Sequence, residues 1–330
     1  MMFKFLGKTG IKVSSLCFGA MSFGGDADES TSAQMYQLCR ETGINFFDCA
    51  NVYSRGKAEE ILGNLIHHER EEIILTSKVY YPMGSDVNAR GSSRRHIIRA
   101  VEASLKRLKT DWIDVYFVHR FDDCTALEQT LRAMDDLVQQ GKILYPAASN
   151  YAAWQVMKAL HISNLHGWAP FEVLQPMYNL VKRQAEVEIL PMAQAEQLAV
   201  ISYSPLGGGL LSGKYGVSAR PDAGRLVENK VYQTRYGEPT MYSVAESFSR
   251  FALEHGYHPA PLAVAWVAAH PAVTSPIIGA RNVEQLRVLL TCLDIKMNAE
   301  LRDKISSLSI TPPPATDRNE ENTVNNYGAR

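Results

Sequence analysis

Short apolar runs alternate with amphipathic segments along almost the whole chain, and this alternation constrains the fold more than any other feature. Eight runs have the length and composition of buried parallel strands, at residues 16–19, 45–48, 73–78, 113–119, 143–148, 173–175, 200–203 and 274–278. Alternating strands and helices predict a parallel sheet. Eight strands are the number that closes a (β/α)8 TIM barrel, an α/β fold, and this is the expected architecture.

The segments between the runs carry the spacing of buried helix faces. From Ser92 to Leu108 the apolar residues stand three and four positions apart, at Ile97, Ile98, Val101, Leu105 and Leu108. A second helix is predicted at 127–140, and it should stop at Gly141, a residue type favoured just past a helix end. Residues 261–269 predict an extra apolar helix before the last strand.

A doubly wound open sheet is the alternative architecture for such an alternation. Its usual dinucleotide fingerprint, GxGxxG, is absent after the first strand, where residues 18–24 read FGAMSFG. Residues 3–13 predict an N-terminal β-hairpin that caps one end of the barrel. Residues 207–242 predict a long loop after the seventh strand, of the kind that is functional or mobile. A single barrel domain is expected at 1–310, followed by a poorly ordered tail at 311–330.

Composition excludes several classes of function. The net charge is −1, and no basic or acidic tail appears, so nucleic acid and anionic membranes are not expected partners. No apolar stretch approaches the roughly 18 residues of a membrane span, and the N-terminal stretch has no run long enough for a signal peptide. The five cysteines lack zinc spacing, so we expect no metal and a cytoplasmic location.

Four chemically versatile residues fall at or just past strand ends. Asp48 ends the second predicted strand, and Tyr53 lies five residues further on. Lys78 ends the third strand, and His119 ends the fourth. In a barrel the carboxyl ends of all strands meet at one rim, the rim that holds active sites. The fold therefore predicts that these four side chains meet in space.

Together the four residues form a plausible acid catalyst. A tyrosine hydroxyl ordinarily has a pKa of about 10, and a nearby ammonium group stabilises its anion. A carboxylate would hold the lysine, and a histidine could hydrogen-bond a carbonyl oxygen. Each residue alone also has a structural interpretation: a strand-end cap, a packed aromatic ring, a solvated lysine and a structural histidine. The interpretation as a site rests on all four occurring together.

The chain resembles the aldo-keto reductases over about residues 3–305. The segments that carry the resemblance are LGKTGIKV at 6–13, FDCANVY at 47–53, TSK at 76–78, DVYFVH at 114–119, SN at 149–150, QPMYN at 175–179, YSPLGGGLLSGKY at 203–215 and IGARNVEQL at 278–286. The resemblance implies an oxidoreductase that reduces an aldehyde or ketone to an alcohol with NADPH. In it, Tyr53 is the proton donor, Asp48 and Lys78 tune that donor, and His119 orients the carbonyl.

The resemblance also implies a cofactor site. Ser149, Asn150 and Gln175 would hydrogen-bond the nicotinamide carboxamide, and Tyr203 would stack on its ring. The pyrophosphate would lie against the segment that contains Ser204, Leu206, Gly207, Gly209 and Lys214. The adenosine 2′-phosphate would lie at Gly279, Arg281 and Gln285, which favours NADPH over NADH. Arg225 is a second candidate for the phosphate.

Some of these segments have a second interpretation, and two positions depart from the family pattern. Residues 149–150 could be the N-cap of a helix at 151–160, and the glycines could serve only a turn. Leu289 stands where many members have an asparagine that contacts the adenine, and a leucine cannot form that hydrogen bond. Cys49 stands where threonine is common, and we expect it to be a packing residue.

The expected substrate is a small carbonyl compound bound among rim loops. Candidate lining residues are Met21, Phe23, Tyr80, Tyr81, Met83 and Phe121, which would form a largely apolar mouth. Nearby arginines could favour an anionic or phosphorylated substrate, but a solvated helix start explains them better; they are Arg90, Arg94 and Arg95. The number of subunits is left open by the sequence.

Two other functions compete with the reductase. The potassium-channel β subunits resemble this chain in the glycine-rich segment, so an NADPH-binding regulatory subunit with little turnover is the main alternative. A phosphate-binding barrel isomerase would leave Ser149, Asn150, Gln175 and Tyr203 without a joint role.

Overall fold

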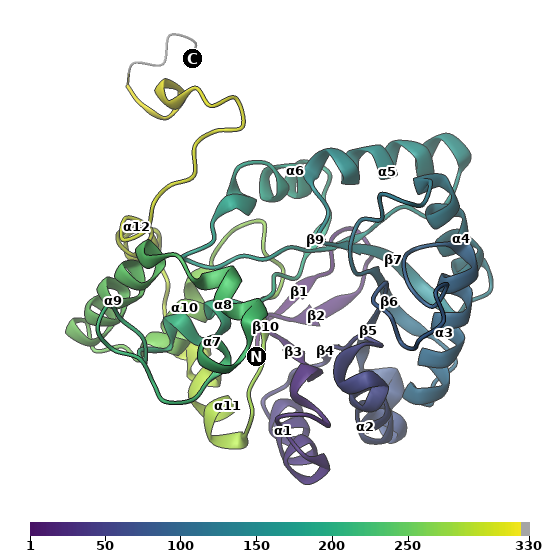
Figure 1. Ribbon diagram of the computed structural model, residues 1–330, viewed down its shortest axis with the longest axis horizontal. Coiled ribbons are helices and arrows are strands. Elements are labelled where there is room, and N and C mark those ends of the chain that lie inside the picture. The colour runs from purple at the N-terminus through teal and green to yellow at the C-terminus, as the bar shows by residue number, and fades with distance from the viewer. Residues whose placement is uncertain (325–330) are drawn as a thin grey trace. The chain divides into compact units, whose positions relative to one another are not determined.

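The computed structural model describes residues 1–324, and its central feature is an eight-stranded parallel sheet (Figure 1). The strands follow the order β10-β3-β4-β5-β6-β7-β8-β9, so β3 to β9 each pair with the next strand in sequence, and β10 pairs with β3. Their bounds are Cys17–Gly19 (β3), Phe46–Asp48 (β4), Ile74–Val79 (β5), Ile113–Val118 (β6), Ile143–Ser149 (β7), Val173–Gln175 (β8), Ala199–Val200 (β9) and Ile277–Ile278 (β10). The predicted parallel (β/α)8 architecture is confirmed, and the doubly wound alternative is excluded by this strand order.

Backbone hydrogen bonds join the two ends of the sheet. The amide of Ile277 donates to the carbonyl of Ser202 at 2.8 Å, and the amide of Thr274 donates to that of Val200 at 2.9 Å. The Thr274 hydroxyl also accepts from the Val200 amide at 3.2 Å. These irregular bonds explain why β9 and β10 are shorter than the predicted strands at 200–203 and 274–278. They close the sheet into a barrel.

An N-terminal hairpin of β1 (Phe3–Phe5) and β2 (Lys12–Ser14) fills one end of this barrel, as predicted. Leu6 and Val13 are fully buried and belong to one apolar cluster with Val115 and other strand residues. The turn lies against the start of β9: a Cβ at Gly7 would come within 2.9 Å of the Gln197 carbonyl oxygen. The hairpin therefore occupies the amino-terminal end of the strands and leaves their carboxyl ends for chemistry.

Helices α1 to α5 lie outside the strands (Figure 1). Their bounds are Glu29–Glu41 (α1), Lys57–Ile66 (α2), Arg94–Leu108 (α3), Leu127–Gln139 (α4) and Ala153–His166 (α5). In α3 the buried face contains Ile97, Val101, Leu105 and Leu108, as the spacing predicts. The Ser93 hydroxyl accepts the His96 amide at 3.3 Å, which caps the start of this helix.

The described chain falls into two compact units. The first comprises Met1–Pro176, Gln197–Tyr203 and Thr274–Val288, and it contains the whole sheet. The second comprises Met177–Glu196, Ser204–Val273 and the chain from Leu289 onward. Its helices are α6 (Ile189–Ala195), α7 (Arg225–Glu228), α8 (Lys230–Tyr236), α9 (Pro239–Glu254), α10 (Pro259–Ala268) and α12 (Ala299–Ser306); α11 (Val283–Leu290) crosses the boundary. That residues 1–310 form one domain stays a prediction.

The segment predicted as a long loop, 207–242, has more structure than its composition indicates. It contains the 3-10 turn η5 (Gly207–Ser212), α7, α8 and the first turn of α9. Local capping explains these helices: Asn229 accepts the Val231 amide at 3.0 Å, and Pro239 begins α9. The predicted apolar helix at 261–269 is α10, buried from Pro259 to Val267.

Residues 311–324 contain one short 3-10 turn, η7 (Asn319–Asn322), as their only helix or strand. The last six residues of the predicted tail, 325–330, lie outside the described residues. Across residues 1–324, no helix has both the length and the apolar composition needed to cross a membrane.

Candidate active site

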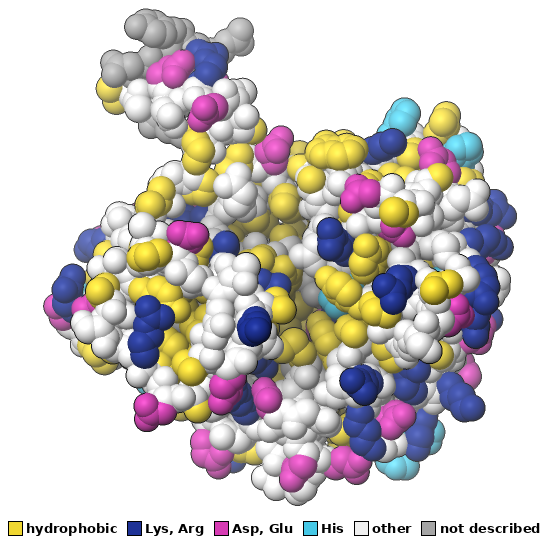
Figure 2. Space-filling view, in the orientation of Figure 1, with side chains coloured by type: hydrophobic (Ala, Val, Ile, Leu, Met, Phe, Trp, Pro, Cys, Tyr) yellow, Lys and Arg dark blue, Asp and Glu magenta, His cyan; other side chains and the backbone are white. Residues whose placement is uncertain are grey.

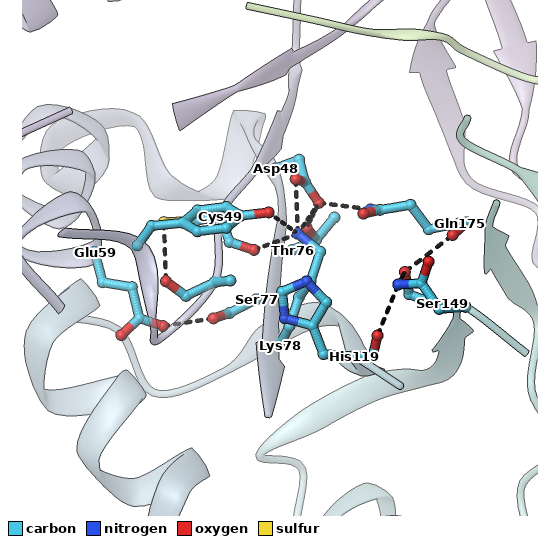
Figure 3. Close-up of polar contacts among 12 residues, drawn as sticks. Asp48, Cys49, Glu59, Thr76, Ser77, Lys78, His119, Ser149 and Gln175 are labelled. Carbon is cyan, nitrogen blue, oxygen red and sulfur yellow. Dashed lines mark hydrogen bonds and ion pairs between the residues drawn. The ribbon is translucent and has the colours of Figure 1, made fainter. Parts of the chain in front are cut away.

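The four predicted catalytic residues lie together. Figure 3 labels three of them, Asp48, Lys78 and His119, at the carboxyl ends of neighbouring strands. Asp48 is the last residue of β4, Lys78 is the next-to-last residue of β5, and His119 follows β6 directly. Tyr53 begins the 3-10 turn η2 (Tyr53–Gly56) in the loop after β4. Parallel pairing of these strands brings into contact residues that are far apart in sequence.

Lys78 and Asp48 form a fully buried ion pair. The Lys78 Nζ lies 2.6 and 2.7 Å from the two carboxylate oxygens and donates to the Cys49 carbonyl at 2.7 Å. The Lys78 side chain is 0% exposed and that of Asp48 is 4% exposed, so water does not satisfy either charge. A buried ion pair of this kind is stable when the other hydrogen-bonding atoms of both side chains also have partners.

Two further donors complete the environment of Asp48. The Thr76 hydroxyl donates to Oδ1 at 2.6 Å, and the Gln175 amide donates to the same oxygen at 2.9 Å. Thr76 lies two residues before Lys78 in β5, on the same face of the strand, so strand periodicity could have identified it. The sequence analysis did not include it.

The Tyr53 hydroxyl lies beside the charged end of Lys78. Nζ is 3.5 Å from the phenolic oxygen and 5.1 Å from the centroid of the ring. A cation at this distance stabilises negative charge on that oxygen. The Tyr53 and His119 rings meet edge to face, with centroids 6.1 Å apart. A carbonyl oxygen bound between these two rings would have hydrogen-bonding groups on both sides.

The surroundings of His119 favour the neutral form of its imidazole. Burial lowers its pKa well below the ordinary value, and the charge of Lys78 lowers it further. Its backbone is fixed on both sides, because the amide donates to the Val79 carbonyl at 2.9 Å and the carbonyl accepts from the Asn150 side chain at 2.9 Å. The buried Nδ1 has no hydrogen-bond partner among residues 1–324. A neutral imidazole ring carries one N–H group, which can donate a hydrogen bond to a ligand.

A left-handed turn positions Tyr53. Ser54 and Arg55 have φ angles of 47° and 54°, and Gly56 has 94°. Two successive non-glycine residues in this region are unusual and must be held by their surroundings. The Ser54 hydroxyl donates to the Phe23 carbonyl at 2.8 Å, and the Arg55 amide donates to the Val52 carbonyl at 3.1 Å.

A second polar cluster joins Ser149, Asn150, Gln175 and Tyr203. The Ser149 hydroxyl donates to the Gln175 carbonyl at 2.9 Å, and the Asn150 amide donates to the Ser149 hydroxyl at 3.0 Å. The Tyr203 hydroxyl donates to the Asn150 side-chain oxygen at 2.7 Å. Helix α5 begins only at Ala153, so the N-cap interpretation of residues 149–150 is wrong. Asn150 instead adopts a φ of 56°.

Arg281 lies just before α11 in the first unit. Its amide donates to the Gln285 side chain at 3.1 Å, and the Gln285 amide donates to the Asn282 side chain at 2.9 Å. The Arg281 side chain is 37% exposed, and its Nε is 3.3 Å from Asp26 Oδ2. A Cβ added at Gly279 would lie 3.6 Å from the Gly19 carbonyl oxygen, an ordinary contact distance, so lack of space does not require a glycine here.

The remaining cofactor candidates belong to the second unit. The Gly207 amide donates to the Ser204 carbonyl at 2.9 Å, and the Gly209 amide donates to the Leu206 carbonyl at 3.0 Å. These two amides therefore serve the turn, and a phosphate-binding role for the segment stays a prediction. Lys214 is exposed. Arg225, the second candidate for the phosphate, lies over the Tyr232 ring. Leu289, which departs from the family pattern, is buried.

The predicted substrate residues separate into two groups. The Tyr81 ring meets the His119 ring edge to face, with centroids 5.0 Å apart. It meets the Tyr80 ring in the same way, with centroids 5.3 Å apart. Met21 is 37% exposed, Met83 is half-buried, and Phe121 packs against Tyr151 at 5.2 Å. Phe23, in contrast, is fully buried and packs on Phe18, so it belongs to the core beneath the rim and does not line a mouth.

The arginines near the start of α3 are largely engaged with carboxylates. Arg94 forms an ion pair with Asp136, and Arg95 lies 3.8 Å from Asp86. Figure 2 shows Lys and Arg side chains, with some Asp and Glu side chains among them, at the right of the view, where Figure 1 labels α3. Ion pairs of this kind at the protein surface are expected where a helix begins in contact with solvent. Arg90 is exposed.

Glu59 is a buried charge that the sequence analysis missed. It lies in α2, is 0% exposed, accepts the Ser77 hydroxyl at 2.5 Å and accepts Arg107 Nε at 2.7 Å. Ser77 precedes Lys78 and points to the opposite face of β5, so Glu59 ties the strand that carries Lys78 to the helix outside it (Figure 3). Cys49 is buried, which raises the pKa of its thiol well above the ordinary value, in keeping with packing.

Comparisons with known proteins agree with this geometry. The sequence profile of the Aldo/keto reductase family matches residues 15–310. The chain is 37% identical over 313 residues to "Uncharacterized oxidoreductase YrpG" of Bacillus subtilis, covering 91% of this chain and 94% of that protein. It is 36% identical over 302 residues to "Probable voltage-gated potassium channel subunit beta" of Arabidopsis thaliana, covering 89% and 92% respectively. A rice protein of the same name is 35% identical, covering 96% of this chain and 99% of that one.

Proposed function

Because the chain belongs to the aldo/keto reductase family and is an oxidoreductase of that family, we propose that it reduces an aldehyde or ketone to an alcohol with NADPH, using Tyr53 as the proton donor. The observation that carries this proposal is the buried Asp48–Lys78 pair with its ammonium 3.5 Å from the Tyr53 oxygen. Such a pair has little structural reason to lie beside a tyrosine hydroxyl, but it supports a general acid.

The chain's own residues account for the proton transfer. A bound NADPH would supply the hydride for the carbonyl carbon, whose π electron pair would then pass to the carbonyl oxygen. Tyr53 gives its proton to that oxygen, which completes the alcohol. Lys78 stabilises the phenolate left behind, and Asp48 holds Lys78 in place. Neutral His119 donates a hydrogen bond to the carbonyl oxygen and orients it.

The residues present fit a nicotinamide cofactor. Ser149, Asn150 and Gln175 offer the mixed donors and acceptors that a carboxamide needs, and Tyr203 offers an aromatic face for its ring. Arg281 beside the first turn of α11 suits the 2′-phosphate, which favours NADPH over NADH. The substrate candidates are Met21, Tyr80, Tyr81, Met83 and Phe121. We further propose a cytoplasmic location.

The substitution Tyr53→Phe tests the proposal. Turnover of a panel of aldehydes, followed by NADPH absorbance, should fall about 10²- to 10⁴-fold because the general acid is lost. The dissociation constant for NADPH should stay within about twofold. A matched control is Tyr145→Phe, whose hydroxyl bonds the Thr9 carbonyl at 3.4 Å in the hairpin; it should keep full activity. Unchanged turnover in Tyr53→Phe would exclude Tyr53 as the proton donor.

A regulatory subunit is the second candidate function, because two similar plant proteins are named as probable potassium channel β subunits. The same residues would bind NADPH in that case, and a partner protein would be the target. Tight NADPH binding with negligible turnover on every aldehyde of the panel would favour this function. Turnover that depends on Tyr53 would favour the enzyme.

A further inference from the structure

The loop between β3 and α1 connects the segment of Arg281, in the proposed cofactor site, with the turn after Tyr53, in the proposed catalytic site. Within it, the Ser22 hydroxyl donates to the Ala280 carbonyl at 2.8 Å, next to Arg281. On its other side, the Phe23 carbonyl accepts from Ser54, the residue after Tyr53. The loop is closed by its own backbone, since the Ala27 amide donates to the Ser22 carbonyl at 2.9 Å and the Gly24 amide to the Ala27 carbonyl at 2.8 Å. Asp26 is thereby held at a fixed place.

Asp26 forms an ion pair with Arg281. Its Oδ2 lies 3.3 Å from Nε, and the two side chains are 46% and 37% exposed. Exposed pairs contribute little to stability, so this pair can exchange partners at low cost. The Asp26 carboxylate therefore pairs with the same guanidinium that would bind the 2′-phosphate of NADPH under the proposed function.

A carboxylate at this place has opposite effects on the two nicotinamide cofactors. It competes with a 2′-phosphate for the guanidinium and repels its negative charge. Toward NADH it can accept a hydrogen bond from the free ribose 2′-hydroxyl, as acidic residues do in other dinucleotide sites. We propose that Asp26 sets the cofactor preference of this chain by weakening NADPH binding at Arg281 relative to NADH. This inference rests on the proposed function.

The experiment is a titration of five proteins, the unmodified protein and four variants, with NADPH and with NADH, by calorimetry at low ionic strength. In Asp26→Asn the dissociation constant for NADPH should fall roughly three- to fivefold, the scale of one exposed ion pair. The dissociation constant of this variant for NADH should stay within about twofold of the value for the unmodified protein, or rise. Asp86→Asn is the matched control, since Asp86 is an exposed aspartate that also pairs with arginines, at 3.7 and 3.8 Å. It should leave both constants unchanged.

The fourth variant, Arg281→Gln with Asp26→Asn, is compared with Arg281→Gln alone. The gain from Asp26→Asn should shrink below about twofold when the guanidinium is absent, because the competition is then gone. Three results would overturn the inference: no change in Asp26→Asn, equal tightening of both cofactors, or the same gain without Arg281. Failure of the unmodified protein to bind either cofactor would instead overturn the proposed function.

Discussion

The most unusual residue of the molecule is Lys78, a lysine with no exposed surface. Its three protons meet four oxygen atoms, those of the Asp48 carboxylate, the Cys49 carbonyl and, at greater distance, the Tyr53 hydroxyl. Removing one member of a buried pair leaves an uncompensated charge, which costs far more than the pair contributes. Stability and the proposed chemistry therefore depend on the same two side chains.

This dependence gives a prediction for Lys78→Met. The free energy of unfolding should fall by about 3–5 kcal/mol, because Asp48 is left buried and unpaired. Denaturant unfolding measures this change. The control Lys142→Met removes a lysine that pairs with Glu102 at the surface, and it should cost less than about 1 kcal/mol.

The double substitution Asp48→Asn with Lys78→Met separates the two consequences of losing Lys78. Neutralising both charges should restore part of the lost stability without restoring carbonyl reduction. A Lys78→Met protein as stable as the unmodified one would show that the pair is not buried as described.

At the scale of elements, the catalytic loop depends on a turn rather than on a helix or strand. Three successive left-handed residues, Ser54 to Gly56, reverse the chain between Tyr53 and α2. A Cβ at Gly56 would lie 2.9 Å from Arg107 Cδ, so this position needs both the φ angle and the space of glycine.

Gly56→Ala should therefore lower both stability and turnover. We expect a loss of about 1–2 kcal/mol in the free energy of unfolding, from the strained φ and the close approach of Arg107. The rate of carbonyl reduction should fall more than NADPH affinity, because Tyr53 shifts while the residues expected to bind the cofactor do not. Gly167→Ala is the control: its φ is 65° with open space around it, and it should cost stability alone. Full turnover in Gly56→Ala would mean that the turn does not position Tyr53.

The sequence predicted the parts of the site that follow from strand periodicity. Asp48, Lys78 and His119 could be placed because the ends of parallel strands meet at one rim. The turn at Ser54 and Arg55 could not, because left-handed angles at non-glycine residues depend on distant partners such as the Phe23 carbonyl. The helices within 207–242 were missed because glycine and proline content obscured caps such as Asn229. Phe23 was misplaced since composition does not tell which face of a loop is buried.

At the scale of the whole molecule, the second unit has a polar network of its own. Tyr178 donates to Glu186 at 2.5 Å, Arg183 pairs with the same carboxylate at 2.8 Å, and Arg302 donates to the Tyr178 hydroxyl at 3.1 Å. The His270 ring meets Tyr178 edge to face at 5.5 Å. Burial, and secondly the charge of Arg302, lower the pKa of His270 to about 4.

This shift predicts how stability depends on pH. An unfolded histidine has a pKa of about 6.5, so between pH 6.5 and 4 the unfolded chain binds more protons than the folded one. The contribution of His270 is complete above about pH 6.5 and is lost as the pH falls toward 4. His270→Asn cannot titrate, and its side-chain oxygen can still accept the Ala272 amide that His270 accepts at 3.2 Å.

Denaturant unfolding at pH 7 and pH 4.5 checks the prediction. The stability of His270→Asn should fall less between the two values than that of the unmodified protein. A substitution of the exposed His161 on α5 should leave the fall unchanged. An equal fall in His270→Asn would show that this histidine does not contribute to acid sensitivity.

The hairpin residues Leu6 and Val13 fill the amino-terminal end of the barrel, and this has a kinetic and an evolutionary consequence. Under the proposed function, substrate and product exchange through the same opening, so an alcohol that leaves slowly would inhibit its own formation. Substrate range and product inhibition then both depend on the rim loops. Relatives can diverge in these loops and acquire new substrates while they retain the hairpin, the barrel and the four residues of the proposed catalytic site.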